Sequence, residues 1–317
     1  MVKTIVVALG GNAIQNAEQT NAVEDPFKSV RNASEQILQI IKDGYRVVLT
    51  HGNGPQAGNL LLQQEESIKL APPQRLDVVV AMTQGQIGYM LQRSLNVVFE
   101  KADLDVKVLT LITQVLVEKD DPGFKDPSKP VGPFYTKRDA KMLSSTKGYR
   151  IRKIKPKGRK VYRRVVPSPD PKDIVEKETI KKLVDLGVVV IASGGGGIAV
   201  TAREDGDFDG IEAVIDKDLA GEKLAEAVNA DVFLILTDVE CVKLNYGKTN
   251  EQNIDRLTLQ EAKKYLQEGH FLAGSMGPKV KACIRFLEFG GEKAIISSLD
   301  KAKEALEGKS GTLFTRV

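Results

Sequence analysis

The chain of 317 residues is long enough for one large α/β domain or two lobes, and its 46 Lys and Arg residues nearly balance 42 Asp and Glu residues. The net charge of only +4 gives no general case for nucleic-acid or membrane binding. Two cysteines, Cys241 and Cys283, are too few and too far apart for a disulfide framework or a zinc site. The apolar run at the N-terminus is too short for a signal peptide, and no apolar stretch reaches about 18 residues, so we expect a cytoplasmic protein.

Short β-branched runs recur along the chain, and each is followed by turn residues and then by a segment with helical spacing. They lack alternation, which is typical of strands that are covered on both faces. These predicted strands occupy residues 4–9, 45–50, 106–113, 187–193, 231–238 and 292–299. Residues 29–44 and 217–230 each place apolar side chains on one helical face. Alternating strands and helices predict an α/β fold with a mainly parallel sheet and helices on both sides.

Residues 119–166 interrupt this alternation. Their first part is rich in proline and glycine, and the second, KGYRIRKIKPKGRKVYRR, is strongly basic around a turn-like PKGRK. Basic runs usually face solvent, and we favour that interpretation over a nucleic-acid patch, because aromatic residues are sparse and no nucleic-acid motif is present. An insertion with hairpin character, forming a lid, fits better, and a second hairpin is predicted over residues 199–214.

Three glycine clusters follow predicted strands, at LGGN (9–12), HGNGPQAG (51–58) and SGGGG (193–197). Ligands of open α/β sheets bind beyond the carboxyl ends of the strands. Glycine lets backbone N–H groups approach a ligand closely, and the N-terminus of a following helix favours negative charge. We therefore expect these clusters to form an anion site.

Two familiar nucleotide-binding patterns are incomplete or weak in this chain. EGKSGT (307–312) is similar to a P-loop, but Lys303 stands where the first glycine is required, and no strand–loop–helix context surrounds it. GNGPQA (52–57) and GGGGIA (194–199) both fit the loose G-x-G-x-x-A pattern of dinucleotide sites, with Asp77 at a suitable distance from the first. Such a match is weak by itself, so a nicotinamide enzyme is a minor alternative.

The two histidines, His51 and His270, leave almost nothing from which to build a histidine-centred metal site or a catalytic triad. His51 directly follows a buried strand, which is more typical of a structural or substrate-orienting residue than of a general base. The site chemistry must therefore come from other groups.

Lysines beside glycine- or proline-containing turns are the remaining candidates: Lys129 in SKPVGPFY, Lys217 in VIDKDLAGEK and Lys279 in GSMGPK. A single loop lysine is ordinarily a solvated surface residue. Three lysines near predicted strand ends suit phosphoryl transfer, where alignment and charge neutralisation dominate catalysis. Asp216 could hold Lys217 in position or cap the helix that begins there, and the two roles can coexist.

The motifs ALGGN, HGNGPQ, SKPVGPFY, RVVPSPDP, IASGGGG, EAVIDKDLAGEKLA, LTDV and AGSMGPK, in this order, resemble those of the carbamate kinases, over essentially the whole chain. The resemblance implies the amino-acid kinase fold, a three-layer α/β/α sandwich with a mainly parallel central sheet and a small protruding subdomain. It implies an N-terminal lobe (1–192) for carbamate or carbamoyl phosphate, with a lid at about 119–166, and a C-terminal nucleotide lobe (193–317). It also implies a homodimer and a reversible reaction of ATP with carbamate, with Mg²⁺, that gives ADP and carbamoyl phosphate.

One detail favours carbamate kinases over their amino-acid-phosphorylating relatives. Enzymes similar to acetylglutamate kinase carry K-x-G-G in the first loop, where the lysine contacts the transferring phosphoryl group. Ala8 stands at that position here, and the resemblance implies that Lys129 from the inserted segment supplies the missing charge.

The resemblance also implies roles for individual residues. Lys217 and Lys129 would neutralise charge on the transferring group, Lys279 would contact the nucleotide phosphates, and Asp216 would orient the lysines. Mg²⁺ would bridge phosphate oxygens and water, without a dedicated protein ligand. The expected acceptor-binding residues are Gly10, Gly11, Asn12, Gly52, Asn53 and Gly54, and the expected nucleotide-binding residues are Gly194, Gly195, Gly196, Asp238, Tyr246, Met276, Gly277 and Pro278.

Two further alternatives remain open at this point. The chain could be another amino-acid kinase that phosphorylates a different carboxylate or phosphate acceptor, although Ala8 and the insertion argue against this. It could also be a non-catalytic nucleotide-binding module, against which the presence of all three lysines and Asp216 argues.

Overall fold

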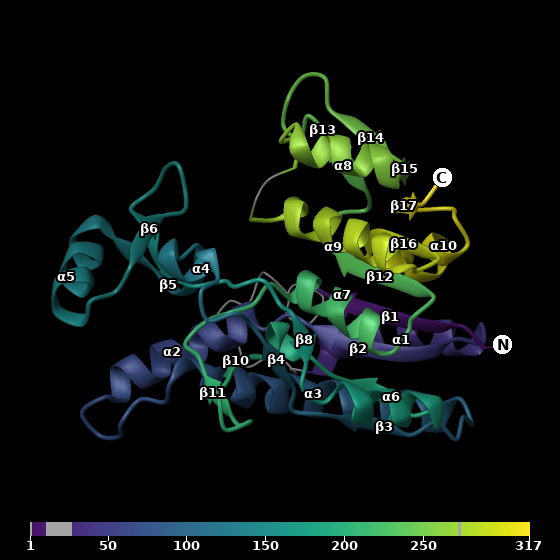
Figure 1. Ribbon diagram of the computed structural model, residues 1–317, viewed down its shortest axis with the longest axis horizontal. Coiled ribbons are helices and arrows are strands. Elements are labelled where there is room, and N and C mark those ends of the chain that lie inside the picture. The colour runs from purple at the N-terminus through teal and green to yellow at the C-terminus, as the bar shows by residue number, and fades with distance from the viewer. Residues whose placement is uncertain (1, 11–26, 272–273) are drawn as a thin grey trace.

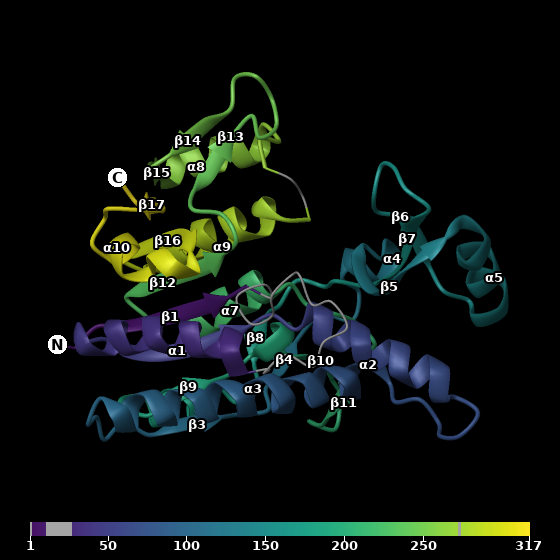
Figure 2. The same ribbon diagram turned by 180° about the vertical axis from the view of Figure 1, so that it is seen from behind.

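The computed structural model describes residues 2–10, 27–271 and 274–317 (Figures 1 and 2). An eight-stranded sheet forms its centre, in the order β15-β17-β16-β12-β1-β2-β9-β3. Neighbouring strands of this sheet are parallel except β16 and β17. Its strands are β1 (Thr4–Leu9), β2 (Arg46–His51), β3 (Val108–Thr110), β9 (Val189–Ile191), β12 (Val232–Thr237), β15 (Arg256–Thr258), β16 (Lys293–Ser298) and β17 (Thr312–Thr315).

Two apolar cores lie on the two faces of this sheet because successive side chains of a strand point in opposite directions. In β1, Ile5 and Val7 belong to one core, and Val6 and Ala8 belong to the other. The first core is closed by α1 (Phe27–Lys42), α3 (Leu76–Lys101) and α10 (Ala302–Leu306). The second is closed by α6 (Lys177–Asp185), α7 (Lys217–Ala227), α8 (Leu259–Gln267) and α9 (Met276–Phe289).

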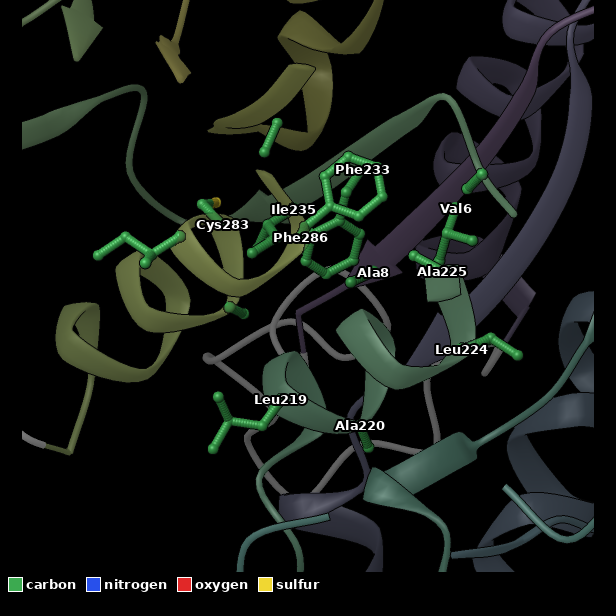
Figure 3. Packing of buried hydrophobic residues seen from close by; sticks show 14 of the residues in the cluster. Val6, Ala8, Leu219, Ala220, Leu224, Ala225, Phe233, Ile235, Cys283 and Phe286 are labelled. Atoms are coloured by element: carbon green, nitrogen blue, oxygen red, sulfur yellow. The ribbon is translucent and has the colours of Figure 1, made fainter. Parts of the chain in front are cut away.

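Helices α7 and α9 pack side by side on the second face (Figure 3). Phe233 of β12 and Phe286 of α9 are both fully buried, with ring centroids 5.7 Å apart, and they belong to the same apolar core as Leu224 and Ala225 of α7. Gly221 lets α7 approach closely, because a Cβ there would lie 3.3 Å from the ring of Phe233. This packing fixes the starting points of the two helices relative to each other.

The three-layer α/β/α architecture that the sequence predicts is confirmed, and the six predicted strand runs all contribute strands to the central sheet. The run at 106–113 is shorter than expected, because the chain leaves the sheet after Thr110 and enters a second sheet of order β11-β10-β4-β8. That sheet contains β4 (Gln114–Leu116), β8 (Asp173–Ile174), β10 (Ile198–Ala202) and β11 (Phe208–Gly210). The hairpin predicted over residues 199–214 is β10 and β11, which pair antiparallel.

A small subdomain protrudes from one end of the body, above the far end of α2 (Gly54–Ser67) (Figures 1 and 2). We call residues 119–166 the lid. It consists of α4 (Pro122–Lys125), β5 (Lys129–Thr136), α5 (Lys137–Lys147), β6 (Ile151–Lys153) and β7 (Lys160–Val166), with the strands in the order β5-β7-β6. The remaining two-stranded sheet, β13 (Val242–Leu244) with β14 (Gln252–Ile254), lies in the C-terminal part of the chain.

None of the helices in the described ranges combines the length and the apolar character needed to cross a bilayer.

Candidate active site

A cavity of about 370 Å³ lies beyond the carboxyl ends of β1, β2 and β12, where the sequence places its glycine clusters. The lid closes one side of this cavity through Lys129, Pro130 and Val131. The loops after the three strands and the segment before α9 supply most of the remaining wall. With the loop after β9 and the first turns of α7 and α9, the lining includes Gly10, Gly52, Asn53, Gly54, Pro55, Gly195, Asp216, Lys217, Asp218, Thr237, Asp238, Gly274, Ser275 and Lys279.

Three helices begin at this cavity. The lining includes Gly54 and Pro55 of α2, Lys217 and Asp218 of α7, and Ser275, the residue before α9. A helix N-terminus carries about half a positive charge and unpaired N–H groups. Three of them around one small cavity make it suited to a ligand with several negative charges.

The three lysines singled out in the sequence converge here, held by two carboxylates. Lys129 Nζ lies 2.8 Å from Asp216 Oδ2. Lys217 Nζ lies 2.5 Å from Asp218 Oδ1, and Lys279 Nζ lies 2.8 Å from Asp218 Oδ2. Asp218 is shared between two ammonium groups, and with Asp238 the lining holds three lysines and three aspartates, so the three helix N-termini supply the excess positive potential.

Asp216 contacts a different lysine from the one next to it in sequence. Its Oδ2 faces Lys129, while its Oδ1 accepts a hydrogen bond of 2.9 Å from the backbone N–H of Asp218. It therefore caps α7 and at the same time holds the lid lysine. The residue that aligns Lys217 and Lys279 is Asp218.

Asp218 is the site residue that the sequence analysis did not identify. An acidic residue in the first turn of a helix normally stabilises that helix, and this ordinary role hides any other. Its second partner, Lys279, lies 61 residues away on α9, so spacing along the chain carries no sign of the contact. The one available signal is its direct position after Asp216 and Lys217 in the segment IDKDLAGEK.

Burial and charge act against each other in this cluster. Burial lowers the pKa of Lys217, and Asp218 only partly opposes this shift. For Asp218, burial would raise the pKa, but Lys217 and Lys279 outweigh it and hold the pKa well below its ordinary value. Burial would likewise lower the pKa of Lys279, but Asp218, together with Asp216 and Asp238, outweighs it and the net shift is upward. Asp218 is therefore ionised throughout the physiological range and keeps Lys279 charged.

The SGGGG loop packs against the 51–54 loop, and glycine is required there for close approach. A Cβ on Gly194 would lie 2.4 Å from His51 Nε2, and one on Gly195 would lie 2.2 Å from Asn53 Nδ2. A Cβ on Gly196 would lie 2.3 Å from the backbone oxygen of Ile215. Of these three glycines, Gly195 lines the cavity. The loop that is predicted from the sequence to bind the nucleotide therefore lies against the HGNG loop.

His51 lies behind the cavity wall, and Asn53 is part of that wall. His51 is 1% exposed, its Nδ1 lies 3.0 Å from the Gly52 carbonyl oxygen, and burial lowers its pKa to about 4. The imidazole is therefore neutral near pH 7, as expected of a structural rather than a proton-transferring residue. Asn53 donates a hydrogen bond of 2.9 Å to Thr83 Oγ1 on α3.

The other predicted nucleotide-binding residues fall into two groups. Asp238 lines the cavity, and Met276, Gly277 and Pro278 form the first turn of α9 beside it. Tyr246 lies between β13 and β14 with 61% of its surface exposed and is not part of the cavity lining. Two of the predicted acceptor-binding residues, Gly11 and Asn12, fall outside the described residues.

Comparison with known proteins agrees with this geometry. A profile of the amino acid kinase family matches residues 3–298. The chain is 55% identical over 314 residues to the carbamate kinase of Pyrococcus furiosus, covering 98% of this chain and 99% of that protein. It is 54% identical to the carbamate kinase of Thermococcus kodakarensis, covering 99% and 100% of the two chains. The structure of carbamate kinase from Giardia lamblia bound to AMP-PNP superposes with a TM-score of 0.90 at 43% identity, covering 99% of this chain and 98% of that one. This chain therefore belongs to the amino acid kinase family and, within it, to the carbamate kinases.

Proposed function

We propose that the protein catalyses the reversible transfer of a phosphoryl group between ATP and carbamate, giving ADP and carbamoyl phosphate. The convergence of Lys129, Lys217 and Lys279 on one cavity with three helix N-termini is the observation that carries this proposal. Family membership and the AMP-PNP complex of the relative from Giardia lamblia support ATP as the phosphoryl donor.

The acceptor side of the cavity suits a small planar anion. We assign carbamate to the wall formed by Gly10, Gly52, Gly54, Asn53 and Gly195. The N–H groups of Gly10 and Gly52 donate to the carbonyls of Leu236 and Leu9, so the N-terminus of α2, which begins at Gly54, would supply the backbone donors. Carbamate already carries a negatively charged nucleophilic oxygen, so the reaction needs no general base. The only histidine at this side, His51, is buried and neutral, which agrees with that requirement.

The lysines then share the work of charge neutralisation. Lys217 lies at the start of α7 and would stabilise the transferring phosphoryl group, and Lys129 would approach the same group from the lid. Lys279 would contact the nucleotide phosphates near Asp238 and the first turn of α9. Asp216 and Asp218 hold the ammonium groups at fixed positions before the ligands arrive, which avoids reorganisation during transfer.

The two-lobe division is part of this proposal, with one change. Residues 1–192 would form the acceptor lobe, and the rest would bind the nucleotide. Gly194 and Gly195 are the exception, and we assign them to the acceptor side because they pack on His51 and Asn53.

Mg²⁺ fits this site as a companion of the nucleotide. The two cavity carboxylates nearest the lysines, Asp216 and Asp218, are already ion-paired, and the described residues contain no group of three His, Cys, Asp or Glu side chains that could hold a metal ion. Phosphate oxygens and water would therefore be its ligands. When bound, Mg²⁺ would offset charge on the nucleotide phosphates beside Lys279.

The proposal is tested by measuring ATP formation from ADP and carbamoyl phosphate by the purified protein. Replacing Lys217 by Ala should lower kcat by about 10²- to 10³-fold, the usual cost of removing a group that stabilises developing charge. Lys223→Ala is a matched control, because Lys223 lies on the same helix but pairs with Glu226.

Three outcomes would contradict the proposal. Near-normal turnover in Lys217→Ala, with wild-type circular dichroism, would remove the mechanism. Transfer to a carboxylate or a phosphate monoester but not to carbamate would identify a different amino-acid kinase. ADP binding without turnover would identify a non-catalytic module.

We also infer a homodimer that forms through α3. One side of this helix exposes Val78, Met82, Tyr89 and Val97, and the neighbouring edge strand β3 exposes Leu109. Among the described strands β3 is the last of the central sheet, and an edge strand beside an apolar helix stripe is suited to isologous association with a second copy. A cytoplasmic location is supported by the two free thiols and by ATP as substrate.

A further inference from the structure

The lid is tethered to the body at Asp170, on the segment that runs from β7 towards β8. Arg285 Nη1 donates a hydrogen bond of 2.6 Å to Asp170 Oδ1, and Arg285 Nη2 donates one of 2.5 Å to Oδ2. Lys281 Nζ lies 3.1 Å from Oδ2. Both basic residues belong to α9, so the outgoing segment of the lid is fastened to the helix that begins at the cavity. Paired, bidentate contacts of this kind fix orientation as well as distance.

The segment that leads into the lid joins the same point. Asp121 Oδ2 accepts a hydrogen bond of 3.1 Å from the backbone N–H of Asp170, and Asp121 Oδ1 accepts one of 2.7 Å from Gly123. The incoming and outgoing segments are therefore tied to each other by Asp121 and to α9 by Asp170. Asp170, Arg285 and Asp121 together are called the tether below.

Helix α7 also reaches the tether. Glu226 of α7 interacts electrostatically with Arg285 and supports its positive charge, whereas burial and Glu226 raise the pKa of the neighbouring Glu222 to about 9, so Glu222 is neutral near pH 7. Burial would raise the pKa of Asp170, but Arg285 and Lys281 outweigh it and keep the pKa below its ordinary value, so the contact stays ionic near pH 7. The side chains of Asp170 and Arg285 are only 29% and 26% exposed, which limits screening by solvent.

Each element that meets at the tether contributes one lysine to the cavity. The lid carries Lys129, α7 begins at Lys217, and α9 carries Lys279 in its first turn. Asp216 and Asp218 adjust the lysines locally, but they do not join the lid to α9. The tether is the contact that does so.

We propose that Asp170 and Arg285 are positioning residues for phosphoryl transfer, which set the lid against α9 so that Lys129 reaches the group that Lys217 and Lys279 hold. This inference rests on the proposed function. The tether acts through Lys129 and does not itself contact substrate. A displacement of about 1 Å in a catalytic group can reduce rate by about 100-fold, so weakening the tether should reduce turnover more than nucleotide binding.

The first test compares Asp170→Asn with Asp170→Glu and with a control variant in the ATP-forming assay. The control is Glu288→Gln, which breaks an ion pair of α9 with Lys263 of α8 that does not involve the lid. Asp170→Asn should lower kcat by about 10- to 100-fold with the KM for ADP changed by less than about threefold. Asp170→Glu should recover most of that loss, and Glu288→Gln should behave as wild type.

The second test asks whether the effect passes through Lys129. In a Lys129→Ala background, adding Asp170→Asn should reduce kcat by less than about threefold, because the group that the tether positions is already gone. The control pair is Lys129→Ala with Glu288→Gln. If Asp170→Asn lowers kcat by the same factor in the wild-type and the Lys129→Ala backgrounds, the inference is overturned.

Folding and the proposed function can be separated from this result. If Asp170→Asn does not fold, Arg285→Lys keeps the charge but loses the bidentate geometry, and it should show the same dependence on Lys129. Wild-type kcat in Arg285→Lys or in a folded Asp170→Asn would overturn the inference while leaving the proposed function intact. Absence of activity in wild type and in Glu288→Gln would instead contradict the proposed function.

Discussion

At the scale of single residues, two aspartates at the start of α7 do different work. Asp216 caps the helix and holds Lys129, and Asp218, two positions later, faces inward between Lys217 and Lys279. A negative side chain this deeply buried is stable only because two ammonium groups surround it. Replacing one lysine leaves Asp218 with the other as its partner, whereas replacing Asp218 leaves two buried ammonium groups without their shared carboxylate.

His51 provides a pH-dependent prediction at this scale. Its pKa is lowered from 6.5 to about 4 by burial, so between these values the unfolded chain binds a proton that the folded protein does not. The folding stability due to this residue is therefore complete above pH 6.5 and falls as the pH drops towards 4, by up to about 3 kcal/mol. His51→Gln should remove this part of the pH dependence.

The measurement is urea denaturation of both proteins between pH 4.5 and 7.5. His51→Gln is expected to be less stable than wild type at pH 7.5, because the ring packs on Gly194, and the difference should shrink in acid. Parallel curves for the two proteins over the whole range would show that His51 is not buried in its neutral form.

At the scale of elements, the basic segment of the lid combines two roles. Much of it is exposed, as the sequence suggested, but some cations cover aromatic rings. Lys155 Nζ lies 4.2 Å from the centroid of Phe134, and Arg164 lies 4.2 Å from that of Tyr149. The lid also contacts the far end of α2, where Tyr149 donates to Glu65 over 3.1 Å. Cation–π contacts thus add to the small apolar core of the lid, which includes Val131, Leu143 and Val161.

In helix α3, a tertiary contact is expected to reverse the usual effect of a Gly→Ala substitution on stability. Gly88 lies inside the helix, where Gly→Ala ordinarily gains about 1 kcal/mol. A Cβ at Gly88, however, would lie 2.2 Å from Cγ2 and 2.9 Å from Oγ1 of Thr110 on the edge strand β3. We expect Gly88→Ala to lower stability by about 1–3 kcal/mol, because the helix must move away from the sheet.

Thermal unfolding of Gly88→Ala, Thr110→Ala and the double variant tests this contact. Thr110→Ala removes the two atoms that approach most closely, so the double variant should be more stable than the sum of the single effects. Additive effects would mean that α3 and β3 are not packed as closely as described.

At the scale of the whole molecule, the site lies where the parts of the chain meet. The acceptor loops, the lid, α7 and α9 each supply a share of one cavity. Helices α7 and α9 also share the buried core around Phe233 and Phe286 (Figure 3), so a change in this packing would move Lys217 relative to Lys279.

The proposed dimer is tested at this scale. The protein should elute with about twice its chain mass of 34.6 kDa in size-exclusion chromatography with light scattering. Met82→Glu combined with Val97→Glu places charges on the exposed stripe of α3 and should give monomers. Leu186→Glu is the control, since Leu186 is 79% exposed at the end of α6 and lies outside that stripe.

A dimer that persists in the double glutamate variant would place the interface elsewhere. A monomeric wild type would contradict the dimer itself.

Local patterns in the sequence determined much of this fold and part of its site. Uninterrupted β-branched runs predict buried parallel strands, as β1 and β12 illustrate. Glycine clusters after the strands indicate the anion cavity. Both patterns can be recognised from the sequence because each is formed by residues that are neighbours in the chain. The tertiary structure alone decided which charges meet. Asp218 joins Lys279 across 61 residues, and Asp170 joins Arg285 across 115. These contacts form because α7 packs against α9 and because the chain returns from the lid to the body. Residues so far apart in the sequence leave no local pattern from which their contact could be predicted.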